Sequence, residues 1–169
     1  MHLMRILAQL SVALRHKDEI NTEISEASVA WHIDHSLRVI NAVYDTLQNS
    51  EPEDYKSEEN PIKSYVLNKK HIKRGIAKAP AHVLPLSTIH PDGILDELEK
   101  AKKAIILFDT LHKKNFFQHH SMGVMKTSEA KKFLKIHTQH HLSIINDILE
   151  SNNITTKKQV RELSSLSTS

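Results

Sequence analysis

Apolar side chains recur at intervals of three and four residues along most of this chain, which is the pattern of amphipathic α-helices. The pattern predicts five helical segments, at about Leu3–Arg15, Ser25–Gln48, Pro61–Arg74, Asp92–His112 and Thr127–Ser151. Each long segment carries one apolar stripe, so we expect the helices to pack around a single core.

Polar residues and prolines mark where these helices begin and where the chain leaves them. Ser25 and Thr127 are N-cap candidates, because their hydroxyls can accept a hydrogen bond from the first helical turn. Residues 75–91 contain three X-Pro steps, which disfavour continuous helix, so an extended connection is expected there. Residues 49–60 and 116–123 are predicted to be loops. On the second helix, Asp34 is predicted to face away from the inward stripe.

Composition favours an all-α fold. The chain of 169 residues has 39% hydrophobic residues but only 3 Gly and 5 Pro, too few for the many tight turns of a β-sandwich or barrel. Four main helices and one long connection are typical of a four-helix bundle with a buried polar site. We expect one domain over residues 1–151 and a tail over 152–169, with one short helix before a frayed end.

Charge and cysteine content limit the function classes. The chain has no cysteine, which excludes disulfides, thiolate metal sites and a cysteine nucleophile. Its net charge of +3 is a small excess, and the basic clusters at 69–74 and 113–114 are interpreted as solvated faces rather than a nucleic-acid surface. No apolar run reaches the roughly 20 residues that span a bilayer, and residues 1–19 resemble an amphipathic helix more than a signal peptide. We therefore expect a cytoplasmic protein without membrane or nucleic-acid partners.

The most informative segment is His137-Thr-Gln-His140-His141, inside an apolar helical run. His137 and His141 are four residues apart, so both project from one helix face, and that face also carries apolar side chains. Two imidazoles stacked in this way can bind a divalent metal ion, and a catalytic site needs one further protein ligand. The alternative is that both are core or boundary histidines without a ligand role.

A third ligand has to come from a facing helix, where His32 and His35 are the candidates. They are three residues apart, and His32 lies nearer the inward stripe, so we predict His32 with His137 and His141 as a facial three-His site with open positions for water. His35 is predicted to be partly exposed, with a role beside the ligands rather than among them.

Three motifs in order resemble those of the DinB-like superfamily of metal-dependent hydrolases and thiol S-transferases, and of one branch of it without an assigned activity. The first motif is His32-Ile-Asp-His35-Ser36, on the second predicted helix. The second is Phe117-Gln-His119-His120-Ser-Met-Gly123, in the loop before the last helix, and the third is His137-Thr-Gln-His140-His141-Leu142, on the last helix. The resemblance covers most of residues 1–150. One departure is His120, which stands where the loop motif of that branch has proline.

The resemblance implies an up-down-down-up four-helix bundle, a homodimer, and nickel or zinc as the metal. It also implies His32, His137 and His141 as the metal ligands. A bound ion of this kind acts as a Lewis acid and can bring the pKa of a coordinated water from 15.7 to about 7.

Two function classes follow. The first is a metal-dependent enzyme, either a hydrolase or a thiol S-transferase, acting on a small molecule that the sequence does not identify. His119, His35 and His140 are its candidate proton shuttles, because an imidazole titrates near neutral pH. The second is a non-catalytic helical module whose histidines are structural or store a metal. A di-iron bundle is disfavoured, because the inward helix faces lack the bridging carboxylates it needs.

Overall fold

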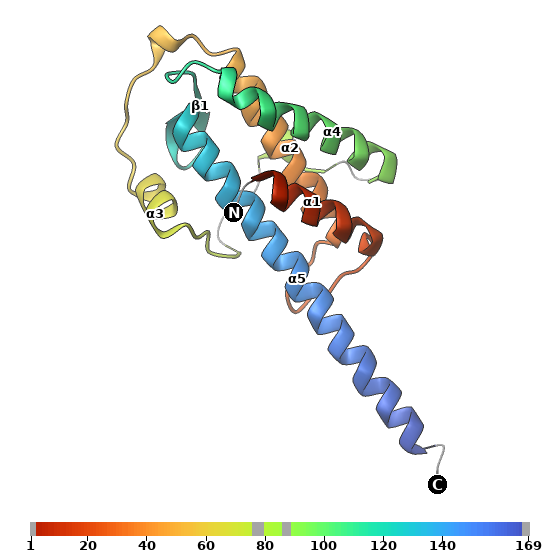
Figure 1. Ribbon diagram of the computed structural model, residues 1–169. Coiled ribbons are helices and arrows are strands. Elements are labelled where there is room, and N and C mark those ends of the chain that lie inside the picture. Colours follow the sequence, from red (N-terminus) through yellow and green to blue (C-terminus); the bar gives the residue numbers. More distant parts are fainter. Residues whose placement is uncertain (1–2, 76–79, 86–88, 167–169) are drawn as a thin grey trace.

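The computed structural model describes residues 3–75, 80–85 and 89–166, with side chains described up to residue 153 (Figure 1). Over these residues the chain is mostly helical. Its elements are the helices α1 (Leu3–Ala13), α2 (Val29–Gln48), α3 (Pro61–Lys69), α4 (Pro91–Leu107) and α5 (Thr127–Leu166), with strands β1 (Phe116–His119) and β2 (Gly123–Lys126). None of these helices is long and apolar enough to cross a bilayer.

The core lies between four of the helices. Helix α2 packs against both α4 and α5, and α1 contacts the same two helices, while α3 packs against α5. The apolar stripes supply the fully buried side chains, among them Ile6, Leu10, Ile33, Leu37, Ile40, Ile94, Leu134 and Ile145. The predicted helical class is confirmed in this coarse form, while the up-down-down-up bundle stays a prediction.

Helix α2 begins later than predicted, and the difference shapes the site. Ser28, not Ser25, is its N-cap, and the Ser28 hydroxyl accepts a hydrogen bond from the amide of Trp31. The amides of Val29 and Ala30 donate to backbone carbonyls in the segment after α1, which satisfies the first free donors of the helix. This tertiary contact selects the later start and leaves the Ser25 hydroxyl free to face His32.

Residues 116–123 are not a simple loop, which makes the predicted all-α class only roughly right. Strands β1 and β2 pair antiparallel, with Phe117 opposite Met125 and both side chains buried. Gly123 follows the turn at φ +67°, a left-handed conformation that favours glycine. Four-residue strands carry too short an alternation for the sequence pattern to separate them from a loop.

The last helix differs from its prediction at both ends. The Thr127 hydroxyl does not cap it but donates to the carbonyls of His112 and Asn115, while the Glu129 carboxylate accepts from the Lys126 amide. The predicted end near Ser151 is wrong, because α5 continues to Leu166 as one helix and extends beyond the others (Figure 1). Residues 152–166 contain neither glycine nor proline, and asparagine costs a helix well under 1 kcal/mol.

Helices α3 and α4 are shorter than predicted. Helix α3 ends at Lys69, because Lys70 adopts a left-handed conformation at φ 53°, and residues 71–75 therefore leave the helix. Helix α4 ends at Leu107 and passes into a single 3-10 turn. The predicted irregular connection over 75–91 is confirmed for its described parts, apart from a 3-10 turn at Ala81–Val83, while 76–79 and 86–88 lie outside the described residues.

Candidate metal centre

Four histidines from two helices meet where α2 packs against α5. His35, His137 and His141 each offer a ring nitrogen, and these three nitrogens lie within 4.8 Å of one another. His32 lies beside this group, with its Nδ1 atom 3.0 Å from Nδ1 of His141. The structure thus brings together the predicted pair on the last helix, but places His35 rather than His32 in the group of three.

His35 is buried, not partly exposed as predicted. His35 and His32 each have 3% of their surface exposed, and all six residues His32–Leu37 are buried. A single inward stripe does not describe this part of α2, which packs against α4, α5 and the Ala81–Val83 turn. Asp34, predicted to face away, is also buried, and its carboxylate is paired with the Arg38 guanidinium at 2.6 Å.

The orientation of the His35 ring is set by two neighbours. Its Nδ1 atom lies 2.9 Å from the backbone carbonyl of Val83, which can only accept, so Nδ1 carries the proton and donates. The other ring nitrogen, Nε2, is then unprotonated and has a free lone pair. The ring of Trp31, one helical turn earlier, stacks on the His35 ring at a centroid distance of 4.9 Å. His35 is therefore held in the tautomer that can coordinate a metal through Nε2.

His137 carries the clearest sign of a missing partner. Its Nδ1 atom is buried and has no hydrogen-bond partner among the described residues. A buried polar atom without a partner costs about 1–3 kcal/mol, so such atoms are rare and usually have an ion, water or ligand as their partner. His137 is a member of the three-His group, so the atom without a partner lies on a residue that could hold an ion.

His141 and His32 form a hydrogen-bonded pair whose protons are linked. One Nδ1 atom has to donate to the other across 3.0 Å. When His141 donates, its Nε2 is unprotonated and available as a ligand, and His32 carries its own proton on Nε2. That atom lies 3.0 Å from the Ser25 hydroxyl, which can accept the bond. In this arrangement His32 orients His141, the kind of support that metal-binding histidines usually receive from a neighbour.

Burial keeps these imidazoles neutral. It lowers the pKa of His137 and His141 well below 6.5, and the neighbouring histidines lower both further. Burial, followed by the charge of His35, lowers the pKa of His32 to about 4. The pKa of His35 is also lowered, mainly by burial. Neutral imidazole is the form that binds a metal ion, so the ligands require no deprotonation at neutral pH.

The donor set fits one divalent transition metal. Nitrogens bound tetrahedrally at about 2.0–2.1 Å from zinc lie about 3.4 Å apart, and the three histidine nitrogens lie within 4.8 Å of one another. Three imidazoles and no thiolate suit zinc, nickel or related ions without choosing between them. The residues present could therefore hold such an ion.

A cavity of about 520 Å³ opens beside the three histidines. Trp31 and Phe133 lie on its wall, and His119 and His140 line it as well. All three predicted proton-shuttle histidines thus lie at the cavity, although His35 belongs to the group of three and the roles of the other two stay predictions.

His119 and His140, the other two predicted proton shuttles, differ in their surroundings. The His119 Nδ1 atom accepts from the amides of Ser121 and Met122 in the hairpin turn, so its proton lies on Nε2. Burial and then His120 lower the His119 pKa to about 4. Burial, followed by the charge of Arg74, lowers the His140 pKa to about 4 as well. Both are neutral near pH 7, so His119 can donate a hydrogen bond through Nε2 and His140 can accept a proton.

Sequence analysis did not identify three residues that influence the candidate site. Val83 acts through its backbone carbonyl, which no sequence pattern identifies. Trp31 had a usable signal, because it precedes His35 by four residues and such pairs are neighbours on a helix. Arg74 acts through its charge, which lowers the pKa of His140, and its guanidinium is held by Asp147 on α5 at 2.6 Å, a contact between distant segments.

No family model, curated protein or solved structure matches this chain, so the assignment of the site depends on its own geometry. The DinB-like resemblance accordingly stays a prediction.

Proposed function

We propose that this protein is a mononuclear metal-dependent enzyme, a hydrolase or a low-molecular-weight-thiol S-transferase, built on a DinB-like four-helix bundle. The observation that carries the proposal is a group of three neutral histidines on the wall of a cavity of about 520 Å³. Pockets of 300–1,000 Å³ are typical of small-molecule sites. Three protein ligands beside such a space resemble a catalytic centre, which keeps a coordination position open.

The alternative is a non-catalytic module with a structural or stored metal. Structural zinc sites are usually closed by four protein ligands. The group found among the described residues has three members, and His32 next to it is already engaged with His141 and Ser25. Together with the adjoining cavity, this favours the enzyme.

The chain's own groups would divide the work. His35, His137 and His141 would hold the ion, with His32 and the Val83 carbonyl keeping His141 and His35 in the coordinating tautomers. A bound divalent ion would supply Lewis acidity, lowering the pKa of a coordinated water or thiol. Because the chain contains no cysteine, a thiol nucleophile has to be a cosubstrate.

Two histidines that line the cavity, His119 and His140, are the candidates to assist proton transfer. His119 carries its proton on Nε2 and lines the cavity, so it can donate a hydrogen bond to a substrate oxygen there. His140 lines the same space, and it can accept the proton that the nucleophile loses and return that proton to the leaving group. Nickel or zinc as the metal and a homodimer complete the proposal, on the strength of the motifs named above. The proposal also keeps the cytoplasmic location that the sequence analysis expects.

The test is turnover by metal-loaded and chelator-treated protein on panels of ester, amide and thiol-transfer substrates. We expect activity that requires the metal and is lost in His141→Ala while the far-ultraviolet circular dichroism is retained. His90→Ala is the matched control, since His90 is exposed and does not line the cavity. Activity that survives both chelation and His141→Ala would contradict the proposal. A metal ion closed by four protein ligands would argue for the structural alternative.

A further inference from the structure

One segment of the chain is free of acidic residues and lies against the cavity. Between Pro61 and Pro91 the sequence has six of the chain's 23 Lys and Arg and none of its 20 Asp and Glu. The rest of the chain, with the other basic residues and all the acidic ones, has a net negative charge. The small overall excess of +3 therefore hides a strongly basic segment.

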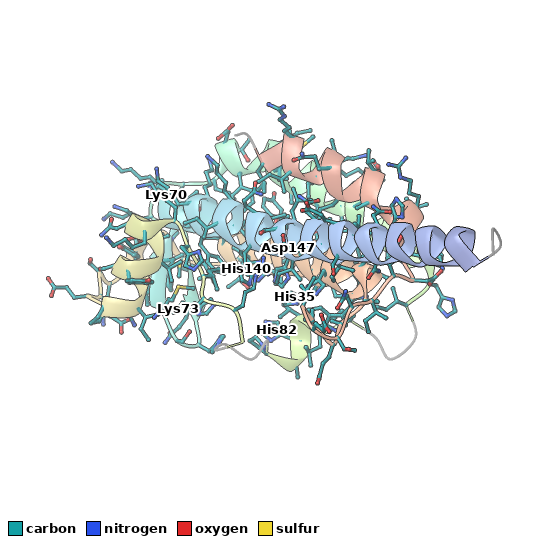
Figure 2. All side chains as sticks on the ribbon, turned by 90° about the horizontal axis from the view of Figure 1, so that it is seen from below. His35, Lys70, Lys73, His82, His140 and Asp147 are labelled. Carbon is teal, nitrogen blue, oxygen red and sulfur yellow. The ribbon has the colours of Figure 1, made fainter. Side chains whose placement is uncertain are left out.

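Described parts of this basic segment form one wall of the cavity. Helix α3 contributes Ile62, Tyr65 and Val66, and the residues after it contribute His71 and Lys73. His82 and Val83, further along, line the same space. Figure 2 shows Lys73 and His82 on the same side of α5 as His35 and His140. Of the described Lys and Arg residues of this segment, Lys73 is the one that lines the cavity.

The cations of this segment differ in whether they are already engaged. The Lys63 amine is buried and donates to the carbonyls of Glu58 and Val124, so it has a structural role. The Arg74 guanidinium binds Asp147. Lys73 is exposed, lines the cavity and has no hydrogen-bond or ion-pair partner among the described residues. Of the described lining residues it is the one with a permanent charge, and none of them is acidic.

The rest of the wall is apolar. Val39 and Val43 from α2, Phe117 from the hairpin and Phe133 from α5 line the cavity, together with Ile72 next to Lys73. A ligand body without charge would bury apolar surface there, at about 25 cal/mol per Å² removed from water. The neutral imidazoles carry no negative charge that would attract a cationic ligand.

We propose that the cavity binds a small molecule with an apolar body and one anionic group, of the carboxylate type, whose charge lies near Lys73. This names the substrate class of the proposed enzyme and rests on that function for its role as substrate. A cationic analogue would meet the charge of Lys73 without an acidic partner. A neutral analogue would gain the apolar contacts alone.

Tryptophan fluorescence can report ligand binding in this cavity. Trp31 is its single tryptophan and lines the cavity, so its fluorescence should respond to a ligand in that space. We would titrate chelator-treated full-length protein with octanoate, octanamide and octylammonium, which share a chain length and differ in charge. Octanoate should bind at least about threefold more tightly than octanamide, as expected for one partly exposed ion pair, and octylammonium should bind most weakly. Added salt should weaken octanoate alone.

Charge variants identify the group responsible. Lys73→Glu should weaken octanoate at least about fivefold and leave octanamide unchanged, while Lys73→Arg should keep the preference. Lys103→Glu is the matched control, because Lys103 is an exposed lysine of α4 outside the cavity. Equal affinities for the three probes, no binding at millimolar concentrations, or an equal loss in Lys103→Glu would overturn the inference.

A parallel metal titration separates this inference from the proposed function. Octanoate preference with no metal binding would remove the enzyme proposal and leave the anion site. Metal binding and turnover without octanoate preference would do the opposite.

Discussion

Truncating His35 and His32 separately tests which of them belongs to the metal-binding group. Sequence spacing predicts His32 as the third ligand, whereas the structure places His35 with His137 and His141. The two substitutions His35→Ala and His32→Ala form a matched pair, because both side chains are 3% exposed and lie on the same helix. Each leaves a similar cavity, so a difference in metal affinity between them reports on coordination rather than on packing.

The structure sets the expected magnitudes. His32 contacts His141 through one hydrogen bond, and losing a partner of this kind typically costs metal affinity 10–100-fold, or about 1.4–2.8 kcal/mol. His35→Ala removes a nitrogen from the group itself, so its loss should exceed about 100-fold. The Val83 carbonyl would also lose its donor, which affects folding stability but not the remaining ligands.

The measurement is competition of zinc and of nickel against a chromophoric chelator, near pH 7.5, on protein first stripped of metal. Urea unfolding of the metal-free variants shows whether both remain folded, and both should lose comparable stability. His35→Asn extends the series, since its amide can still donate to Val83 while the coordinating nitrogen is gone. We expect its metal affinity to match that of His35→Ala.

The reverse ranking would refute the structural assignment. If His35→Ala binds zinc as the unaltered chain does and His32→Ala loses more than about 100-fold, the ligand set is the one predicted from spacing. Equal large losses would indicate that all four histidines bind the ion, and the case for an open position would fail with them.

Further perturbations test the surroundings of the site. Metal-free protein should lose stability as the pH falls from 6.5 toward 4, by up to about 3 kcal/mol from His32 alone. The pKa of His32 is about 4 in the folded state, so the unfolded chain binds the proton first. Urea unfolding at several pH values would detect this loss, and a flat profile would contradict it. Gly123→Ala should cost about 1–2 kcal/mol in the same assay, since φ is +67° and a Cβ atom would lie 2.5 Å from the Glu58 carboxylate; no change would refute the strain. Ser28→Ala should cost about 1 kcal/mol by removing the cap of α2, whereas an equal effect of Ser25→Ala on helix content would contradict the cap assignment. Saturating zinc at 100 times its dissociation constant should stabilise the protein by about 2.7 kcal/mol, and no shift in the unfolding midpoint would mean that zinc does not bind the folded state.

The helical class and the pairing of His137 with His141 on one helix face follow from the sequence alone. Long 3.6-residue periodicity predicts helices because it depends only on local geometry, and the described residues are mostly helical. The spacing of His137 and His141 placed both on one face, since neighbours four residues apart on a helix are set by the backbone alone. The acid-free run from Pro61 to Pro91 can likewise be read from the sequence.

Contacts between distant segments decided the rest. Six consecutive residues of α2 are buried because other elements cover it on several sides, so no single stripe could identify His35 as the partner of the pair. The N-cap moved to Ser28 because carbonyls of the preceding segment satisfy the first amides of the helix. The chain leaves α3 at Lys70. Residues from 71–75 and from the turn at Ala81–Val83 then line the cavity together with residues of α2 and α5. Each of these features depends on which surfaces meet, and local propensity carries no information about that.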